Sequence, residues 1–158
     1  MRIRAFAAAV LFVASAVPVI GQSVSYSRSF ESQLRCRANP QAGKLLTDLR
    51  TSGYIDRTYV VEDTISYFKL LKPLRILGFN PVAVFGFQQG YEKLFARGPG
   101  TLPPEMIGIV VRGNQDNVKL RLRNLGIDNL EVEPHEYDIN GRHKVKRSGL
   151  VAIACWAT

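Results

Sequence analysis

Five lysines and arginines occupy every second position of two apolar segments in the second half of the chain: Lys119, Arg121, Arg123, Lys144 and Lys146. Side chains two residues apart on a β-strand share one face of the sheet. The spacing therefore predicts two strands that each present cations on one face. If the two faces coincide, they would bind an anion or an acidic protein surface, because crowded like charges are costly without a counter-charge.

A solvated sheet face is the alternative interpretation of the same cations. In that case Glu131 and Glu133 would pair with them from an intervening strand, and no ligand would be needed. Nucleic acid is not expected as the partner, because a predicted leader directs export and no aromatic residues are interleaved with the cations. We expect an acidic protein or an anionic polymer of the cell envelope instead.

Glutamates and histidines form a second group with strand spacing. Glu131, Glu133 and His135 would share one face, and His143 follows a turn at 138–141. Carboxylates and imidazoles so placed could bind a transition metal or act as an acid–base pair. No HExxH or GxSxG sequence accompanies them, so surface histidines and cross-strand ion pairs are the favoured interpretation. We accordingly expect no cofactor and a protein that is not an enzyme.

A loop rich in glycine and proline, RGPGTLPP, covers residues 97–104. Proline stiffness reduces the entropy lost when a loop docks, so Leu102 within it is a candidate apolar contact for a partner. A structural connector is the alternative. The loop has no GK[ST] sequence after its glycines, and neither has GFQQG at 86–90, so no phosphate loop is predicted.

The first residues have the three parts of a secretory signal peptide. A basic start, an apolar run over 5–17 and small residues up to Gly21 predict cleavage after Gly21. An uncleaved membrane anchor is the alternative. No later apolar stretch is long enough to span a membrane, so no transmembrane segment is expected after cleavage. We expect a periplasmic or secreted protein that consists of residues 22–158.

Composition indicates one ordinary globular domain over 22–158. The chain has 158 residues, of which 46% are hydrophobic and 22% charged, which excludes disorder over most of the chain, and no heptad persists that would predict a coiled coil. Its 21 Lys and Arg outnumber its 13 Asp and Glu, for a formal charge of +8. Removal of a leader that contains Arg2 and Arg4 would leave +6, so the remaining protein is still basic.

The two cysteines, Cys36 and Cys155, lie close to the two ends of the predicted domain. An oxidising compartment favours a disulfide between them, which would stabilise the fold by about 4–5 kcal/mol in the chain-entropy model. A reactive thiolate is the alternative, because Arg35 and Arg37 flank Cys36 and could lower its pKa. The disulfide is the favoured prediction.

Hydrophobic periodicity predicts one helix followed by short strands. The helix covers 41–51, with Asn39 as its cap and Pro40 at its first position. Residues 58–71 predict a hairpin, or a short helix capped by Asp63. Further strands are predicted at 74–77, 82–87, 107–112, 118–123, 130–137, 142–146 and 150–156. The fold class is therefore α+β, with one N-terminal helix packed on an antiparallel sheet of about six short strands and termini tied by a disulfide.

These features together predict a small exported, non-enzymatic binding protein for an anionic envelope component or an acidic protein, similar in role to an inhibitor or immunity factor. A small envelope metal-binding protein or hydrolase that uses His135, His143 and Glu133 is one alternative. A structural accessory subunit of an envelope complex, docked through its apolar loop, is the other.

Overall fold

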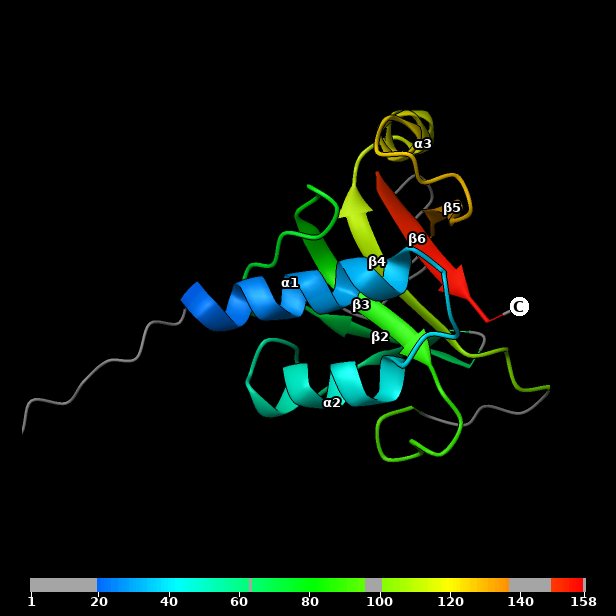
Figure 1. Ribbon diagram of the computed structural model, residues 1–158. Helices are drawn as coiled ribbons and strands as arrows, with labels where there is room; N and C mark the ends of the chain where they lie inside the picture. The colour runs from blue at the N-terminus through cyan, green and yellow to red at the C-terminus, as the bar shows by residue number, and fades with distance from the viewer. Residues whose placement is uncertain (1–19, 63, 96–100, 137–148, 158) are drawn as a thin grey trace, which may run out of the picture.

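The computed structural model of the chain describes residues 20–62, 64–95, 101–136 and 149–157. Within these ranges the elements follow the order α1 (Ile20–Leu34), α2 (Ala42–Thr51), β1 (Val60–Glu62), β2 (Ile65–Lys69), β3 (Pro81–Phe87), β4 (Met106–Arg112), α3 (Gln115–Asn124), β5 (Glu131–His135) and β6 (Leu150–Trp156). The predicted α+β class is confirmed (Figure 1).

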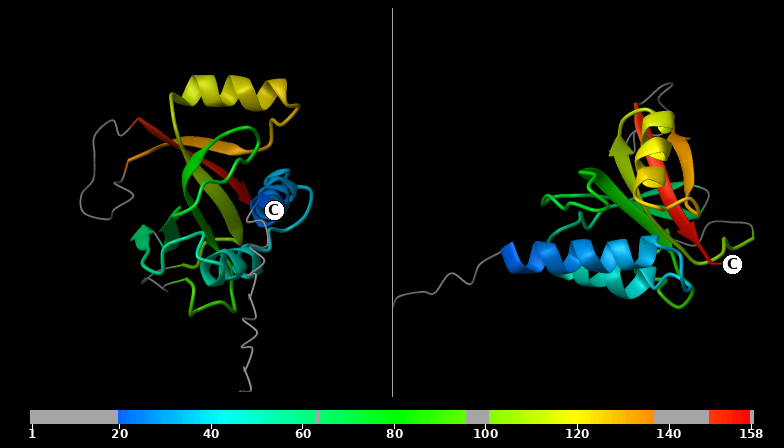
Figure 2. Two further views of the ribbon diagram at one scale, coloured as in Figure 1. Left: turned by 90° about the vertical axis from the view of Figure 1, so that its left-hand side faces the viewer. Right: turned by 45° about the horizontal axis from the view of Figure 1, so that its top comes forward.

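The strands form one antiparallel sheet in the order β1-β2-β3-β4-β6-β5. The central strand β4 pairs with both β3 and β6, and Ile109 lies opposite Val84 on one side and Ile153 on the other. The sheet is strongly curled, and α1 and α2 lie side by side on one of its faces (Figures 1 and 2). Helix α3 packs against β5 at the other end of the molecule from α2.

Apolar residues one helical turn apart explain why α1 and α2 pack as they do. Phe30 and Leu34 of α1 are fully buried. The ring of Tyr26 packs edge-on against the ring of Tyr54, with the ring centres 5.1 Å apart. The apolar stripe of α2, which was predicted from the sequence, is buried as well and consists of Leu45, Leu46 and Leu49. These stripes cover the face of the sheet that carries Ile107, Ile109 and Ile153, and together they form the core.

Gly86 on β3 allows α2 to approach the sheet closely. A Cβ atom at this position would lie 2.7 Å from the Met106 carbonyl oxygen and 3.1 Å from the Cβ of Ala42. Any larger side chain would push α2 off the sheet.

The predicted disulfide between Cys36 and Cys155 is confirmed. It joins residues 119 positions apart in sequence, with a Cα–Cα distance of 5.5 Å, and ties the segment after α1 to the end of β6. No free cysteine remains among the described residues.

Most predicted elements are confirmed, namely the helix at 41–51, the hairpin at 58–71 and the strands at 82–87, 107–112 and 150–156. The strand predicted at 130–137 is confirmed over Glu131–His135. Three predictions are wrong. The N-terminal region holds two helices instead of one, since α1 precedes the predicted helix. Residues 118–123, predicted as a strand, are helical. Residues 74–77, also predicted as a strand, contribute only an isolated bridge between Ile76 and Phe79. The helix begins after Gln41, whose side chain makes no cap bond, rather than after Asn39.

Two further predictions concern residues outside the described ranges. The strand at 142–146 lies there entirely, and so does the leader up to residue 19. The expected cleavage point after Gly21 falls in the first turn of α1. Among the described helices, none combines the length and apolar character that a bilayer crossing requires.

Candidate binding surfaces

The predicted row of cations at 119–123 does not form one face, because this segment is helix α3. Successive side chains of a helix point about 100° apart, so Lys119 and Arg123 lie one turn apart while Arg121 points elsewhere. Val118 and Leu122, at the same spacing of four, are the buried residues of α3. Leu120, which a strand would have buried with them, is 53% exposed.

Local signals for this helix were present in the sequence. Asn114 is its N-cap, and the side-chain oxygen of Asn114 accepts a hydrogen bond of 2.8 Å from the backbone N–H of Asp116. Gly126, with a positive φ of 69°, follows the C-terminal end. The apolar residues at 118, 120 and 122 fit the period of a strand, and 118 and 122 also fit that of a helix, so the cap was the observation that could have distinguished the two.

Arg121 connects α3 to the segment between β2 and β3. Its Nη2 donates a hydrogen bond of 2.7 Å to the carbonyl oxygen of Gly78, and its guanidinium lies 4.5 Å from the ring centre of Phe79. Arg121 is therefore fixed in place, whereas Lys119 and Arg123 extend from the exposed side of the helix. Lys144 and Lys146, the other two predicted cations, lie outside the described residues.

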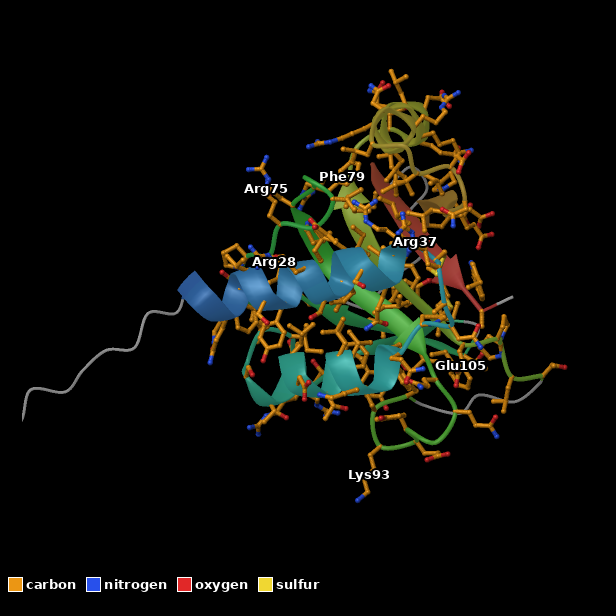
Figure 3. The ribbon with its side chains drawn as sticks, in the orientation of Figure 1. Arg28, Arg37, Arg75, Phe79, Lys93 and Glu105 are labelled. Carbon is orange, nitrogen blue, oxygen red and sulfur yellow. A yellow bond between two sulfur atoms is a disulfide. The ribbon has the colours of Figure 1, made fainter. Side chains whose placement is uncertain are left out.

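A different cationic surface is present, which we call the basic rim. It combines two adjoining grooves that meet at Pro73, of about 430 and 330 Å³. Its members come from α1, the end of β2, the segment that follows β2, the end of β4, and α3: Arg28, Lys69, Lys72, Arg75, Arg112 and Arg121. Figure 3 shows Arg28 and Arg75 on the same side of the molecule, near Phe79.

Few carboxylates balance these cations. Glu31 is the one acidic residue among the groove residues that the structure describes, and its Oε1 accepts a hydrogen bond of 2.8 Å from the backbone N–H of Leu77. Within the described ranges, Arg28, Arg75 and Arg112 form no ion pair. Lys72 points toward the protein, where its ammonium group lies 2.9 Å from the Ser52 carbonyl oxygen. The described part of the rim thus holds more cations than its one carboxylate can balance.

Each groove of the basic rim also contains an exposed apolar side chain. Val24 lies in the groove beside α1 and is 44% exposed, and Leu71 lies in the other groove and is 58% exposed. An apolar residue between cations is typical of a protein–protein contact, where it supplies buried area and the charges supply orientation.

The second predicted group lines a concave cleft on the face of the sheet opposite α1 and α2. Glu131, Glu133 and His135 lie at alternate positions of β5, and all three border this cavity of about 680 Å³. Glu131 and Glu133 are exposed, whereas His135 is 6% exposed. The other lining residues are Glu62, Ile65, Tyr67, Phe85, Pro103, Met106, Pro134, Glu136, Ala152, Ala154 and Trp156.

Aromatic rings form one wall of the concave cleft. The rings of Tyr67 and Phe85 stack with their centres 4.7 Å apart, and the imidazole of His135 lies 4.9 Å from Tyr67. Burial lowers the pKa of His135 below its usual value, because a protonated ring would lose hydration in this position. Sequence reasoning did not identify Tyr67, Phe85 or Trp156, since no local pattern links them to β5.

The remaining predicted site residues are His143 and Leu102. His143 lies outside the described residues, and within the described part of the chain no three His, Cys, Asp or Glu side chains converge as a metal site would require. Leu102, the predicted apolar contact of the 97–104 loop, is partly buried and packs against the core. Residues 101–104 have no regular secondary structure.

Comparison of the chain with family models, with curated proteins and with solved structures found no match.

Proposed function

We propose that this chain is a small exported, non-enzymatic binding protein that recognises the acidic surface of a partner protein through its basic rim. The observation that carries this proposal is the concentration of five cations along two adjoining grooves whose described lining contains one carboxylate, with Arg121 beside them at Gly78. Such a surface is costly to maintain alone and is stabilised when an anionic surface meets it. It also accelerates encounter with an acidic partner.

A protein partner fits the basic rim better than a uniformly charged polymer. Val24 and Leu71 are exposed between the cations, and each would bury apolar area only against a partner with apolar groups of its own. A polyanion of the envelope would use the charges but not these two side chains. The contribution of Leu71 therefore distinguishes the two kinds of partner.

Export is supported by two independent features. The leader pattern over 1–21 predicts secretion. The disulfide between Cys36 and Cys155 is of the kind that persists in oxidising compartments. A role similar to that of an inhibitor or immunity factor fits a small basic binding protein in such a compartment.

The test compares capture of envelope proteins by the wild-type chain and by charge-reversed variants. Arg28→Glu/Arg75→Glu removes two cations of the rim that have no internal ion pair. Arg37→Glu/Lys93→Glu is the matched control, because it changes the net charge equally at exposed residues outside the two grooves; Figure 3 shows Lys93 at the far end of the molecule from Arg75.

We expect one acidic protein to be captured by the wild type and by the control but not by Arg28→Glu/Arg75→Glu. Leu71→Ser should also weaken its capture at high salt. Salt screens the charge contacts of the rim but not the buried apolar contact of Leu71, so this contact should matter most under that condition. Capture of polymeric material that is released by salt and is insensitive to Leu71→Ser would identify an envelope polyanion instead. Equal capture by both charge-reversed variants would refute a role for the basic rim.

A further inference from the structure

The concave cleft has a volume of about 680 Å³, and the charge of its described lining is opposite to that of the whole chain. Four glutamates border it, Glu62, Glu131, Glu133 and Glu136, and none of its described lining residues is Lys or Arg. The chain as a whole carries a formal charge of +8. Among the residues that the structure describes, the lining of this cleft is therefore acidic, in a protein that is otherwise rich in cations.

The register of β5 and β6 explains the depth of the cleft beside these carboxylates. Glu131 lies opposite Ala154, and Glu133 lies opposite Ala152. Side chains of paired residues in an antiparallel sheet point to the same face, so the two carboxylates stand next to methyl groups instead of large side chains. The short residues leave room for a ligand between the carboxylates and the aromatic wall.

The rings beside the cleft differ in exposure: Phe85 is 1% and Tyr67 9% exposed, whereas Trp156 is partly exposed. The stacked pair Tyr67–Phe85 lies on β2 and β3, across the cavity from β5 in sheet order. Trp156 borders the cleft at the end of β6, and its buried Nε1–H has no acceptor among the described residues. Aromatic rings attract organic cations through their electron-rich faces, and carboxylates nearby add a direct charge contact.

We propose that the concave cleft binds a small organic ammonium compound that carries an apolar body. The body would lie against Trp156 and Tyr67, and the ammonium group would lie beside Glu131 and Glu133. The cavity of about 680 Å³ is within the usual size of small-molecule sites, roughly 300–1,000 Å³. This site is separate from the basic rim and does not depend on the function proposed for it.

The single tryptophan of the chain gives a local signal for binding, because Trp156 borders the cleft. Benzyltrimethylammonium is a suitable probe, since it combines a quaternary ammonium group with one aromatic ring. Benzoate has a similar ring and the opposite charge, so it is the matched control ligand. We expect a saturable change in Trp156 emission with benzyltrimethylammonium and none with benzoate.

Two double variants test the residues of the site. Glu131→Gln/Glu133→Gln keeps the side-chain size and removes two charges, so the affinity for benzyltrimethylammonium should fall about tenfold or more, the effect of one lost charge contact. Glu92→Gln/Asp116→Asn makes the same change in charge at exposed positions outside the cleft and should bind as the wild type does. Both should keep a wild-type far-UV circular dichroism spectrum, because none of the four side chains is buried.

Several outcomes would overturn the proposal. They are equal binding of benzoate, binding that Glu131→Gln/Glu133→Gln leaves unchanged, a response to calcium or zinc ions but not to the ammonium probe, and no emission change at millimolar probe. Arg28→Glu/Arg75→Glu should leave probe binding intact. Failure of the basic rim and failure of this cleft are therefore distinguishable.

Discussion

Three strands separate β2 from β5 in the sheet, yet the rings of Tyr67 and His135 lie 4.9 Å apart. In a flat sheet, strands in these positions would be about 19 Å apart, four times the usual interstrand spacing. The curl of the sheet therefore brings two distant strands together across its concave face. Through this contact, residues 68 positions apart in sequence form one wall of the cleft.

Acidification should destabilise the fold through His135. Its pKa is lowered by burial in the folded state, so the unfolded chain binds a proton more readily. The stabilisation that the neutral ring provides is complete at pH values above the pKa of histidine in the unfolded chain, roughly 6.5. It is lost as the pH falls from there toward the lower pKa of His135 in the folded state. One such group changes the free energy of unfolding by at most about 1.4 kcal/mol per pH unit.

Urea unfolding at pH 7.5 and at pH 5 measures this effect. The variant His135→Gln keeps a polar side chain of similar size but does not titrate, so its stability should change less between the two pH values than that of the wild type. An equal pH dependence in wild type and variant would show that other groups cause it.

Gly108 should tolerate no side chain, although it lies in the middle of a strand. A Cβ at this position would contact the Cζ of Phe85 and lie 2.6 Å from the carbonyl oxygen of Ile153. Gly108→Ala is expected to lower the free energy of unfolding by about 1–3 kcal/mol, as overpacking does elsewhere. It should also displace Phe85 from Tyr67.

The variant Phe85→Leu tests this packing through a double-mutant cycle. Leucine lacks the far end of the ring, so Gly108→Ala should cost less in the Phe85→Leu background than alone. Additive effects in thermal or urea unfolding would contradict the contact between the ring of Phe85 and the backbone of Gly108.

Much of the fold could be predicted from the sequence because its signals are local. The stripe of α2, the β-prone hairpin and the continuous apolar run of β6 each identify their own element. Helix α1 was missed because Tyr26, Phe30 and Leu34 are separated by mostly polar residues, many of them serine, next to a segment that predicts a leader. Helix α3 was assigned as a strand because its cations alternate with apolar residues.

The candidate surfaces were less predictable because they depend on contacts distant in sequence. The common face of Glu131, Glu133 and His135 follows from a spacing of two on one strand. The aromatic wall opposite them requires the strand order and the curl of the sheet, which no local pattern specifies. The basic rim likewise combines residues from α1, β4, α3 and the segment after β2.

Among the cations of α3, Arg121 should be the one that matters for stability. Arg121→Ala removes the hydrogen bond to Gly78 and the contact with Phe79, with an expected loss of about 1–2 kcal/mol at an exposed site. Lys119→Ala and Arg123→Ala should stay within about 0.5 kcal/mol of wild type, as exposed substitutions usually do. Equal losses for the three variants in urea unfolding would indicate that α3 is not anchored through Arg121.

The disulfide should make the largest single contribution to stability. Replacement of both cysteines, as Cys36→Ala/Cys155→Ala, frees a loop of 119 residues; the chain-entropy model predicts a loss of about 4–5 kcal/mol for such a loop. Alanine is the suitable replacement at Cys155 because that side chain is fully buried and a hydroxyl group would need a partner there. Urea unfolding of the variant and of reduced wild type should give the same midpoint.

Backbone conformation adds a finer prediction at the same site. Cys36 has a positive φ of 49° just after α1, and its N–H donates to the Gln33 carbonyl oxygen at 3.1 Å. This is the position where helices commonly end with glycine, because a side chain is strained in the left-handed region. Once the disulfide is absent, Cys36→Gly/Cys155→Ala should therefore be more stable than Cys36→Ala/Cys155→Ala, by about 1 kcal/mol. The opposite order of urea midpoints would show that the greater freedom of glycine in the unfolded chain outweighs the relief of strain at this helix end.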